Sequence, residues 1–375
     1  MQTTIAQRMT ETGGRPTGFD YLRLALAVLI VCWHSIVTSY GLAAQTVASS
    51  APWRPLIAVL LPAFFTLSGF LVAGSLERSK TIGMFLGLRA LRIYPALAVE
   101  SLIAALILGP LLTTKPLAAY FADHDFHIYF LNILGDPQFV LPGVFKTNPV
   151  DLVNIQLWTI PYELRCYVML TGLAVLGAVR RPAILLAATL AYMAWGLTDT
   201  LLHYPFYATY VAGPAPAWLL LANFLCGVLL HAYRERIPWK WSWGLASLAA
   251  ALVLYDIPAG HYAAVPLLSY ATVFFGLTNP PKTGLLKGAD YSYGIFLYGS
   301  VIQQTFVALA PWGRHWWINI AVSVPASALV AALSWHLVEK RALGFKTQLA
   351  RWEARWLARR DAQPAPAAVK DAGIA

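Results

Sequence analysis

The sequence is poor in charge and in cysteine. Only 12% of its 375 residues are charged, whereas 58% are hydrophobic and the mean hydropathy is +0.60. A soluble domain usually carries about 25% charged residues, so an ordinary soluble fold is excluded and the lipid bilayer is the expected solvent. The cysteines lie in apolar runs without CxxC spacing, which argues against a disulfide scaffold or a zinc site. They are Cys32, Cys166 and Cys226.

Long apolar runs dominate what is present. A transmembrane helix needs roughly 20 apolar residues, and about ten runs meet or approach this length. They lie near 19–40, 56–76, 92–113, 157–178, 182–202, 216–233, 241–256, 261–277, 290–310 and 315–338. The sequence therefore predicts an all-α polytopic membrane protein with about ten transmembrane helices.

The basic residues lie mainly between these runs, so the net charge of +10 does not indicate nucleic acid binding. With the amino terminus in the cytoplasm, 22 of the 27 Lys and Arg fall on the cytoplasmic side, four fall outside, and Arg165 lies within a span. This bias predicts that both termini are cytoplasmic. Because Arg8 and Arg15 precede the first run, it could be a signal peptide, but Asp20 at its start and the lack of an A-x-A site favour a span.

Three regions follow from this pattern: a cytoplasmic segment 1–18, a transmembrane domain 19–341, and a cytoplasmic region 342–375. In the last region, aromatic and basic residues alternate at helical spacing, which is typical of a basic amphipathic helix on an anionic leaflet. These residues include Phe345, Leu349, Trp352 and Trp356. The Pro/Ala stretch after Gln363 is expected to be disordered. Membrane lipid is therefore an expected partner.

The longest connection, 114–156, is predicted to be non-helical and to lie on the outer side. Its D-H-D-F-H segment from Asp123 to His127 contains residues that could ligate a metal. No further set of ligands is visible, so we interpret the segment as a solvated or re-entrant loop and predict no metal.

Ionisable residues inside a membrane are costly, so each is a candidate for function. His34 lies about halfway across the first span, and Arg23 precedes it by eleven residues, or ~16 Å of helix, on nearly the same face. A neutral imidazole there could take a proton from a hydroxyl. From the spacing alone, a structural histidine bonded to a neighbouring helix is equally consistent.

Two further clusters carry charge at the ends of spans. Arg89 and Arg92 share one helix face at the inner interface, where two guanidiniums could bind phosphates, although such a pair is also a topology signal. Glu163 and Arg165 are two residues apart and point to different faces, so each needs another helix or a water-filled cavity as its partner. A Glu163 side chain that faces His34 or Arg92 would have such a partner.

Together these segments resemble the membrane-bound acyltransferase family 3, the transmembrane O-acyltransferases of bacterial surface glycans. The resemblance is carried by Arg23-x10-His34, the FFTLSGFL segment from Phe64, Arg89-x-x-Arg92-I-Y-P, and LWTIPYE ending at Glu163. Order and spacing match across about Gly18–Tyr167. The later SYGIFLY and WHLVEKR segments match more loosely.

This resemblance implies a ten-helix fold in the bacterial inner membrane that moves an acyl group, usually acetyl, from cytoplasmic acyl-CoA. The implied acceptor is a hydroxyl of a polysaccharide, lipopolysaccharide or lipid-linked saccharide, and no permanently bound cofactor is expected. By the same resemblance, His34 corresponds to the essential histidine, acting as general base or acyl relay, and Arg23 to its basic partner. Arg89 and Arg92 correspond to the arginines that handle the donor, and Glu163 to the acidic position of its segment.

The ninth span departs from the family, in which many members carry a histidine after Y-L. Here Tyr298 is followed by Gly299 and Ser300, then by Gln303 and Gln304, which puts the role of this helix in acceptor choice in doubt. Two other functions are compatible with buried charge. A multispan transporter or flippase of a glycan or lipid would move its substrate without an acyl donor, and a membrane scaffold would tolerate loss of His34. The acceptor, the acyl group and the oligomeric state stay open.

Overall fold

The computed structural model describes residues 3–14, 16–50, 52–203, 217–257, 260–284 and 289–361, and within them it contains helices but no β-strand. Each predicted apolar run overlaps a helix. In chain order, these helices are α2 (Gly18–Tyr40), α5 (Leu60–Arg78), α6 (Ile82–Ile103), α10 (Ile160–Val175), α11 (Pro182–His203), α12 (Ala217–Ala232), α13 (Trp241–Tyr255), α14 (Gly260–Gly276), α15 (Ser292–Leu309) and α16 (Trp316–Ser334).

Four helical stretches are long and apolar enough to cross a membrane, and two shorter apolar helices accompany them. The long stretches are Gly18–Tyr40, Arg54–Arg78, Ile82–Leu112 and Trp316–Arg359, and the shorter ones are Trp218–Ala232 and Trp241–Tyr255. In the last long stretch only 28% of the most apolar window is buried inside the protein. So much outward-facing apolar surface is expected of a helix that contacts lipid. The structure is therefore that of a helical membrane protein.

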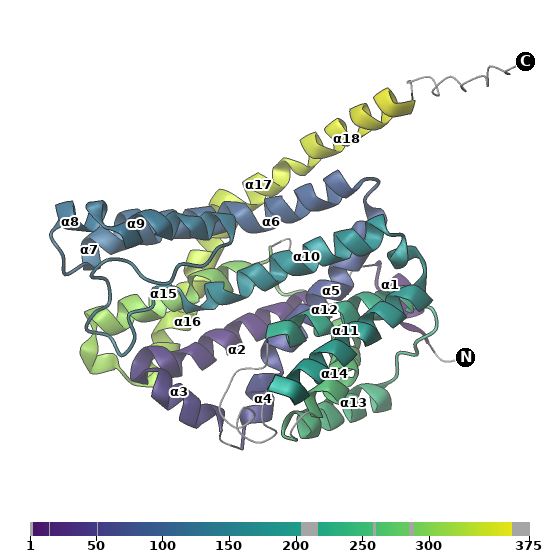
Figure 1. Cartoon of the computed structure of the whole chain (residues 1–375), viewed down its shortest axis with the longest axis horizontal. Coiled ribbons are helices and arrows are strands. Elements are labelled where there is room, and N and C mark those ends of the chain that lie inside the picture. Colours follow the sequence, from purple (N-terminus) through teal and green to yellow (C-terminus); the bar gives the residue numbers. More distant parts are fainter. Residues whose placement is uncertain are drawn as a thin grey trace, which may run out of the picture.

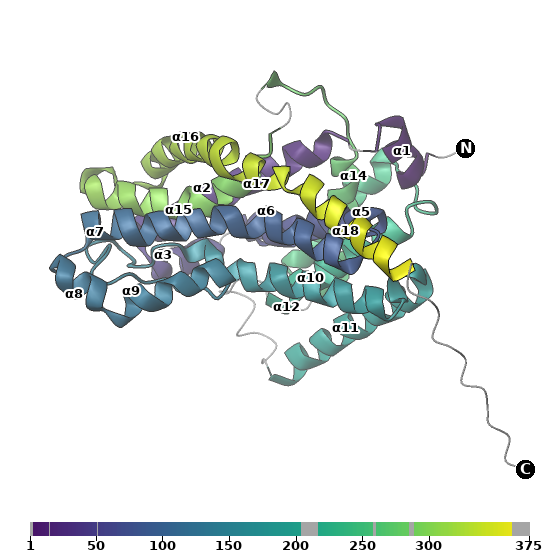
Figure 2. The same cartoon turned by 90° about the horizontal axis from the view of Figure 1, so that it is seen from above.

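The two ends of the bundle differ. The short helix α1 (Ile5–Glu11) and the last helix α18 (Lys346–Asp361) lie at one end, which we call the terminal end (Figures 1 and 2). Helices α7 (Gly109–Leu112), α8 (Leu117–Ala122) and α9 (His124–Ile128) lie at the opposite end, which we call the loop end. Placement of α1 and α18 at the same end is what an even number of crossings requires.

The connection 114–156 is not the non-helical stretch that the sequence predicted. It contains α8, α9 and a 3-10 turn at Tyr129–Leu134. Asp123 caps α9, because its carboxylate accepts the backbone N–H of Asp125 at 3.0 Å. Tyr120 and Phe126 are buried in a common cluster beneath these turns. The elements are too short for a helical period to be visible in the sequence.

The amphipathic helix predicted near the carboxyl end is present as α18. Leu349 packs against Gly87 of α6, where an added Cβ would lie 2.5 Å from a Leu349 methyl group. Trp352 and Trp356 stay 64% and 56% exposed. Glu353 of the same helix accepts a hydrogen bond from Thr81 at 2.6 Å. The helix thus docks through Leu349 and Glu353 and leaves its tryptophans outward, and its contact with lipid remains a prediction. The tail after Gln363 lies outside the described residues.

Helices α5 and α12 meet backbone to backbone. A Cβ added at Gly69 would lie 2.0 Å from the carbonyl oxygen of Phe224, and one at Gly227 would lie 2.2 Å from that of Thr66. Small residues permit such close helix contacts in membranes. This crossing brings one face of α12 to the wall of the cavity described next.

Candidate active site

A cavity of about 880 Å³ opens among α2, α5, α6, α10, α12 and α15, a volume typical of small-molecule sites. Helix α5 lines it from Leu61 to Arg78, which is ~26 Å of helix. Lys80 and Lys346 line it at the terminal end, and Phe64 lies near its deep end. The cavity is therefore long and narrow, and its long axis is parallel to the helices.

Positive charge predominates in this cavity. Among the described residues, six basic side chains and three carboxylates line it. The basic ones are Arg23, Arg78, Lys80, Arg89, Arg92 and Lys346, and the acidic ones are Glu163, Asp290 and Glu353. Such an excess inside low-dielectric walls attracts an anionic ligand.

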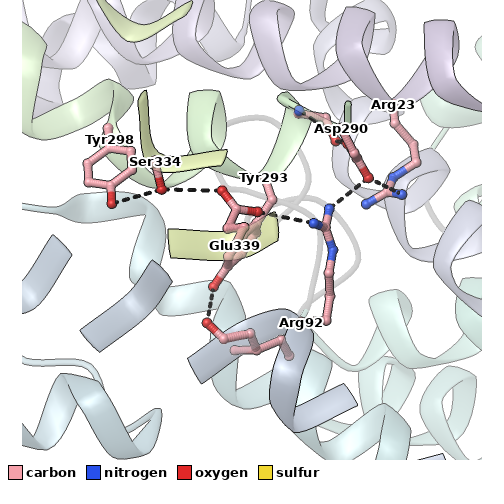
Figure 3. Close-up of polar contacts among 9 residues, drawn as sticks. Arg23, Arg92, Asp290, Tyr293, Tyr298, Ser334 and Glu339 are labelled. Atoms are coloured by element: carbon pink, nitrogen blue, oxygen red, sulfur yellow. Dashed lines mark hydrogen bonds and ion pairs between the residues drawn. The ribbon is translucent and has the colours of Figure 1, made fainter. Parts of the chain in front are cut away.

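Two of the arginines are neutralised by carboxylates from distant parts of the chain (Figure 3). Arg23 on α2 and Arg92 on α6 contact the same Asp290 oxygen, at 2.8 and 2.7 Å. Arg92 also contacts Glu339 at 3.1 Å. We call these four residues the Asp290 network. It joins α2, α6, the start of α15 and the segment after α16 into one charge-balanced group.

Helix α15 supports this network from one side. The Ser292 hydroxyl donates to Asp290 at 2.6 Å. The ring of Tyr293 lies 5.3 Å from the Arg92 guanidinium, within the range of a cation–π contact. The Tyr293 hydroxyl donates to the carbonyl of Ile93 at 3.0 Å. These bonds hold Arg92 in place and leave it little freedom to turn toward a ligand.

Arg89 is in a different situation. Its Nη2 donates to the Ser75 hydroxyl at 3.3 Å, and its guanidinium lies 6.0 Å from the ring of Tyr167. Its Nε is buried without a hydrogen-bond partner, and it forms no ion pair within the described part of the chain. The predicted arginine pair is thus divided: Arg92 binds carboxylates of the protein itself, and Arg89 does not.

Glu163 and Arg165 do point to different faces, as predicted. Glu163 lines the cavity and accepts a hydrogen bond from the Tyr167 hydroxyl. Arg165 faces outward, with its guanidinium 4.9 Å from the ring of Tyr162. Glu163 shares the cavity with Arg92, but no ion pair joins them in the described ranges. Glu163 and Arg92 therefore line the same cavity without a direct bond between them.

The backbone around His34 is fixed from both sides. One turn earlier, Gln303 of α15 donates to the carbonyl of Val31 at 2.8 Å. One turn later, Thr38 donates to the carbonyl of His34 at 3.0 Å and accepts from Asn319 of α16 at 3.0 Å. The imidazole itself is half-buried and makes no hydrogen bond to any residue in the described ranges. The helix is held firmly while the ring keeps its hydrogen-bonding capacity.

The deep end of the cavity lies close to this segment of α2. Leu61 and Phe64 pack against the cluster that contains Val31 and Phe296. Phe64 and Phe296, with ring centroids 6.3 Å apart, also line the cavity. His34 follows Val31 by one turn and is not part of the lining. An aromatic pair therefore lies between the cavity and the segment that carries His34.

Two carboxylates of the connection 114–156 form ion pairs with lysines. The Lys115 ammonium bonds to Asp123 and lowers the pKa of that carboxyl, and Lys146 does the same for Asp151. Across the residues that the structure describes, no group of three or more potential ligands is close enough to hold a metal ion. In the D-H-D-F-H segment, the acidic residue at the start caps a helix.

Several polar residues of these helices escaped the sequence analysis. Asp290 and Glu339 belong to the network above, and Glu100 of α6 is fully buried, where it accepts from Asn154. A carboxylate within or beside an apolar run is a usable signal, and Glu100 and Glu339 both carry it. His231 of α12, which lines the cavity, carries the same signal, because it lies within the predicted run 216–233.

Comparison with known proteins agrees with this architecture. Residues 17–339 match the acyltransferase domain family Acyl_transf_3. The chain belongs to this acyltransferase family. It is 29% identical over 374 residues to nodulation protein 10 of Rhizobium leguminosarum bv. viciae, covering 90% of this chain and 96% of that protein. It is 24% identical over 343 residues to an O-acetyl transferase of Shigella phage Sf6, covering 87% and 95%. No solved structure matches.

The family match confirms the resemblance seen in the motifs and identifies this membrane protein as an acyltransferase. An acyltransferase needs an acyl donor and an acceptor. The cavity provides space and positive charge for one of these two substrates.

Proposed function

We propose that this acyltransferase moves an acetyl or other short acyl group from cytoplasmic acyl-CoA to a hydroxyl of a cell-surface glycan, such as a polysaccharide or lipopolysaccharide. The observation that carries the proposal is Arg89, which forms no ion pair in the described part of the chain and lines a positively charged cavity about 26 Å long by helix rise. Coenzyme A carries several phosphates on a long arm, which suits such a cavity. The relative named O-acetyl transferase supports a hydroxyl acceptor and acetyl as the group.

The donor would enter from the terminal end, which we place in the cytoplasm. This orientation goes with about ten spans across the bacterial inner membrane and with both termini on the cytoplasmic side. The bias of Lys and Arg supports it, as does the position of α1 and α18 at the same end. Phosphates bound by Arg89 through charge-assisted hydrogen bonds would then direct the thioester toward the deep end.

His34, which lies beyond the Phe64–Phe296 pair at the deep end, acts on the acceptor. Its neutral imidazole takes the proton of the acceptor hydroxyl as the oxygen attacks the thioester carbonyl. The carbon–sulfur bond then breaks, and the imidazolium returns the proton to the departing thiolate, which gives an ester and free CoA. General-base assistance of this kind supplies about 10²–10⁴ in rate. Arg23, a member of the Asp290 network, stabilises the helix that carries His34. Glu163 contributes a hydrogen-bonding carboxylate to the cavity.

The test is the ester content of surface glycans, measured by mass spectrometry in a deletion strain that expresses wild type, His34→Ala or Arg89→Gln at matched membrane levels. We expect wild type to restore an ester whose mass identifies the acyl group, and both variants to fail. His127→Ala, an exposed histidine of the outer connection, is the matched control and should behave as wild type. Full activity of His34→Ala would show that this histidine is not the base. Absence of any gene-dependent ester would contradict the glycan acceptor.

A further inference from the structure

A second histidine faces the cavity. His231 of α12 is 6% exposed and lines the wall next to Phe70, with ring centroids 5.3 Å apart. Its neighbours on α5 are Phe70, Gly74 and Glu77, which places it ~14–24 Å in helix rise from the level of Leu61. It therefore belongs to the terminal end of the cavity and takes no part in the chemistry proposed for His34.

One ring nitrogen of His231 is already occupied. Its Nε2 lies 2.8 Å from the Glu77 carboxylate, which also accepts from Arg234 at 2.9 Å. Arg234 in turn donates to the carbonyl of His231 at 2.9 Å. The bond to Glu77 thus orients the ring, and Arg234 holds Glu77 in place. The other nitrogen, Nδ1, is buried and has no hydrogen-bond partner in the described ranges, and an unpaired buried polar atom is costly.

Two arginines reach the turn of α5 that His231 contacts. A Cβ added at Gly74 would lie 3.0 Å from Cε1 of His231 and 3.2 Å from Nη1 of Arg78, so glycine here lets both side chains approach the same point of α5. The next residue, Ser75, accepts a hydrogen bond from Arg89. Arg78 and Arg89 both line the cavity and form no ion pair among the residues that the structure describes.

We propose that Arg78, Arg89 and His231 form a phosphate site for the nucleotide end of the acyl donor, and that it binds the ribose phosphate of coenzyme A. With Nε2 donating to Glu77, an imidazolium presents its Nδ1–H to the cavity as the donor that a phosphate oxygen needs. Glu77 is a positioning residue, because it orients the ring and stabilises its positive charge without touching the ligand. The nucleotide of the acyl donor stays at the terminal end of the cavity, and its thioester arm extends along α5.

This inference rests on the proposed acyl-CoA donor, so its test separates the two. Purified protein in nanodiscs is titrated with CoA and with dephospho-CoA, which lacks only the ribose phosphate, and both dissociation constants are measured by calorimetry. We expect wild type to prefer CoA by about tenfold to a hundredfold, the range of one charged hydrogen bond. His231→Gln and Arg78→Gln should each remove most of this preference while dephospho-CoA binds within about twofold of wild type. The unchanged affinity for dephospho-CoA also shows that the variant is folded.

Glu77→Gln should reduce the preference in part, because it keeps a hydrogen bond to the ring but not the charge. Glu235→Gln, an exposed carboxylate four residues after His231, is the matched control and should leave the preference intact. A wild-type protein that binds both ligands equally would overturn the phosphate site, as would variants that keep the preference or lose both affinities equally. Arg78 is exposed, so we expect Arg78→Gln to fold. If His231→Gln does not fold, the preference measured for Arg78→Gln decides whether the phosphate site stands. Failure of wild type to bind either ligand would instead refute the acyl-CoA donor itself.

Discussion

The substitution Asp290→Asn should destabilise the protein strongly, because the Asp290 carboxylate contacts two arginines. Its side chain is only 18% exposed, and it accepts from Arg23 and Arg92 on a single oxygen. Asp290→Asn leaves two largely buried guanidiniums with Glu339 as their remaining carboxylate. Breaking a buried ion pair from one side costs about 3–5 kcal/mol. Partial exposure of all three side chains places the expected loss near the lower bound, at about 3 kcal/mol.

The assay is thermal denaturation of detergent-solubilised protein, followed by the fraction that stays monodisperse. A loss of this size should lower Tm by about 5–10 °C. Asp151→Asn is the matched control, since it makes the same chemical change in the Lys146–Asp151 pair, whose side chains are 45% and 43% exposed. Pairs so exposed contribute about 0–1 kcal/mol, so Tm should shift by less than about 2 °C.

Adding Arg23→Gln to Asp290→Asn provides a second test of the same reasoning. If the loss comes from uncompensated charge, removal of one arginine should recover part of the stability, and the double variant should melt above Asp290→Asn alone. A single Asp290→Asn variant that melts within about 1 °C of wild type would refute the reasoning. A double variant whose losses simply add would show that hydrogen-bond geometry, and not charge balance, determines the stability.

Two more outcomes follow from the division of roles in the cavity. Arg89→Gln should weaken acyl-CoA binding tenfold or more, since a charged hydrogen bond is worth about 1.5–3 kcal/mol, and its Tm should stay near that of wild type. Arg92→Gln should instead lower Tm by several degrees. Equal Tm losses in both variants would contradict this division.

The sequence alone determined where the apolar helices lie along the chain. Long apolar runs and the period of the helix are local properties, so the runs near 19–40 and 182–202 coincide closely with α2 and α11. The same locality explains why the opposite orientation of Glu163 and Arg165 was predicted correctly. The motif order also sufficed to predict the acyltransferase family, which the family match confirms.

The short helices of 114–156 were missed for the converse reason. Elements of five or six residues complete fewer than two turns, so no period is visible, and their stability comes from Tyr120 and Phe126 packing into a shared cluster. Helix formation in such short pieces depends on tertiary contacts rather than on propensity.

Only the tertiary structure decided which charges are free. Arg89 and Arg92 are three residues apart and carry the same charge, so the sequence treats them alike. Asp290 and Glu339, which neutralise Arg92, follow it by 198 and 247 positions, and no local pattern predicts such partners. Likewise, His231 meets Glu77 only because α5 and α12 cross at two glycines. Ion pairing depends on distance in space, and that distance is set by how the helices pack.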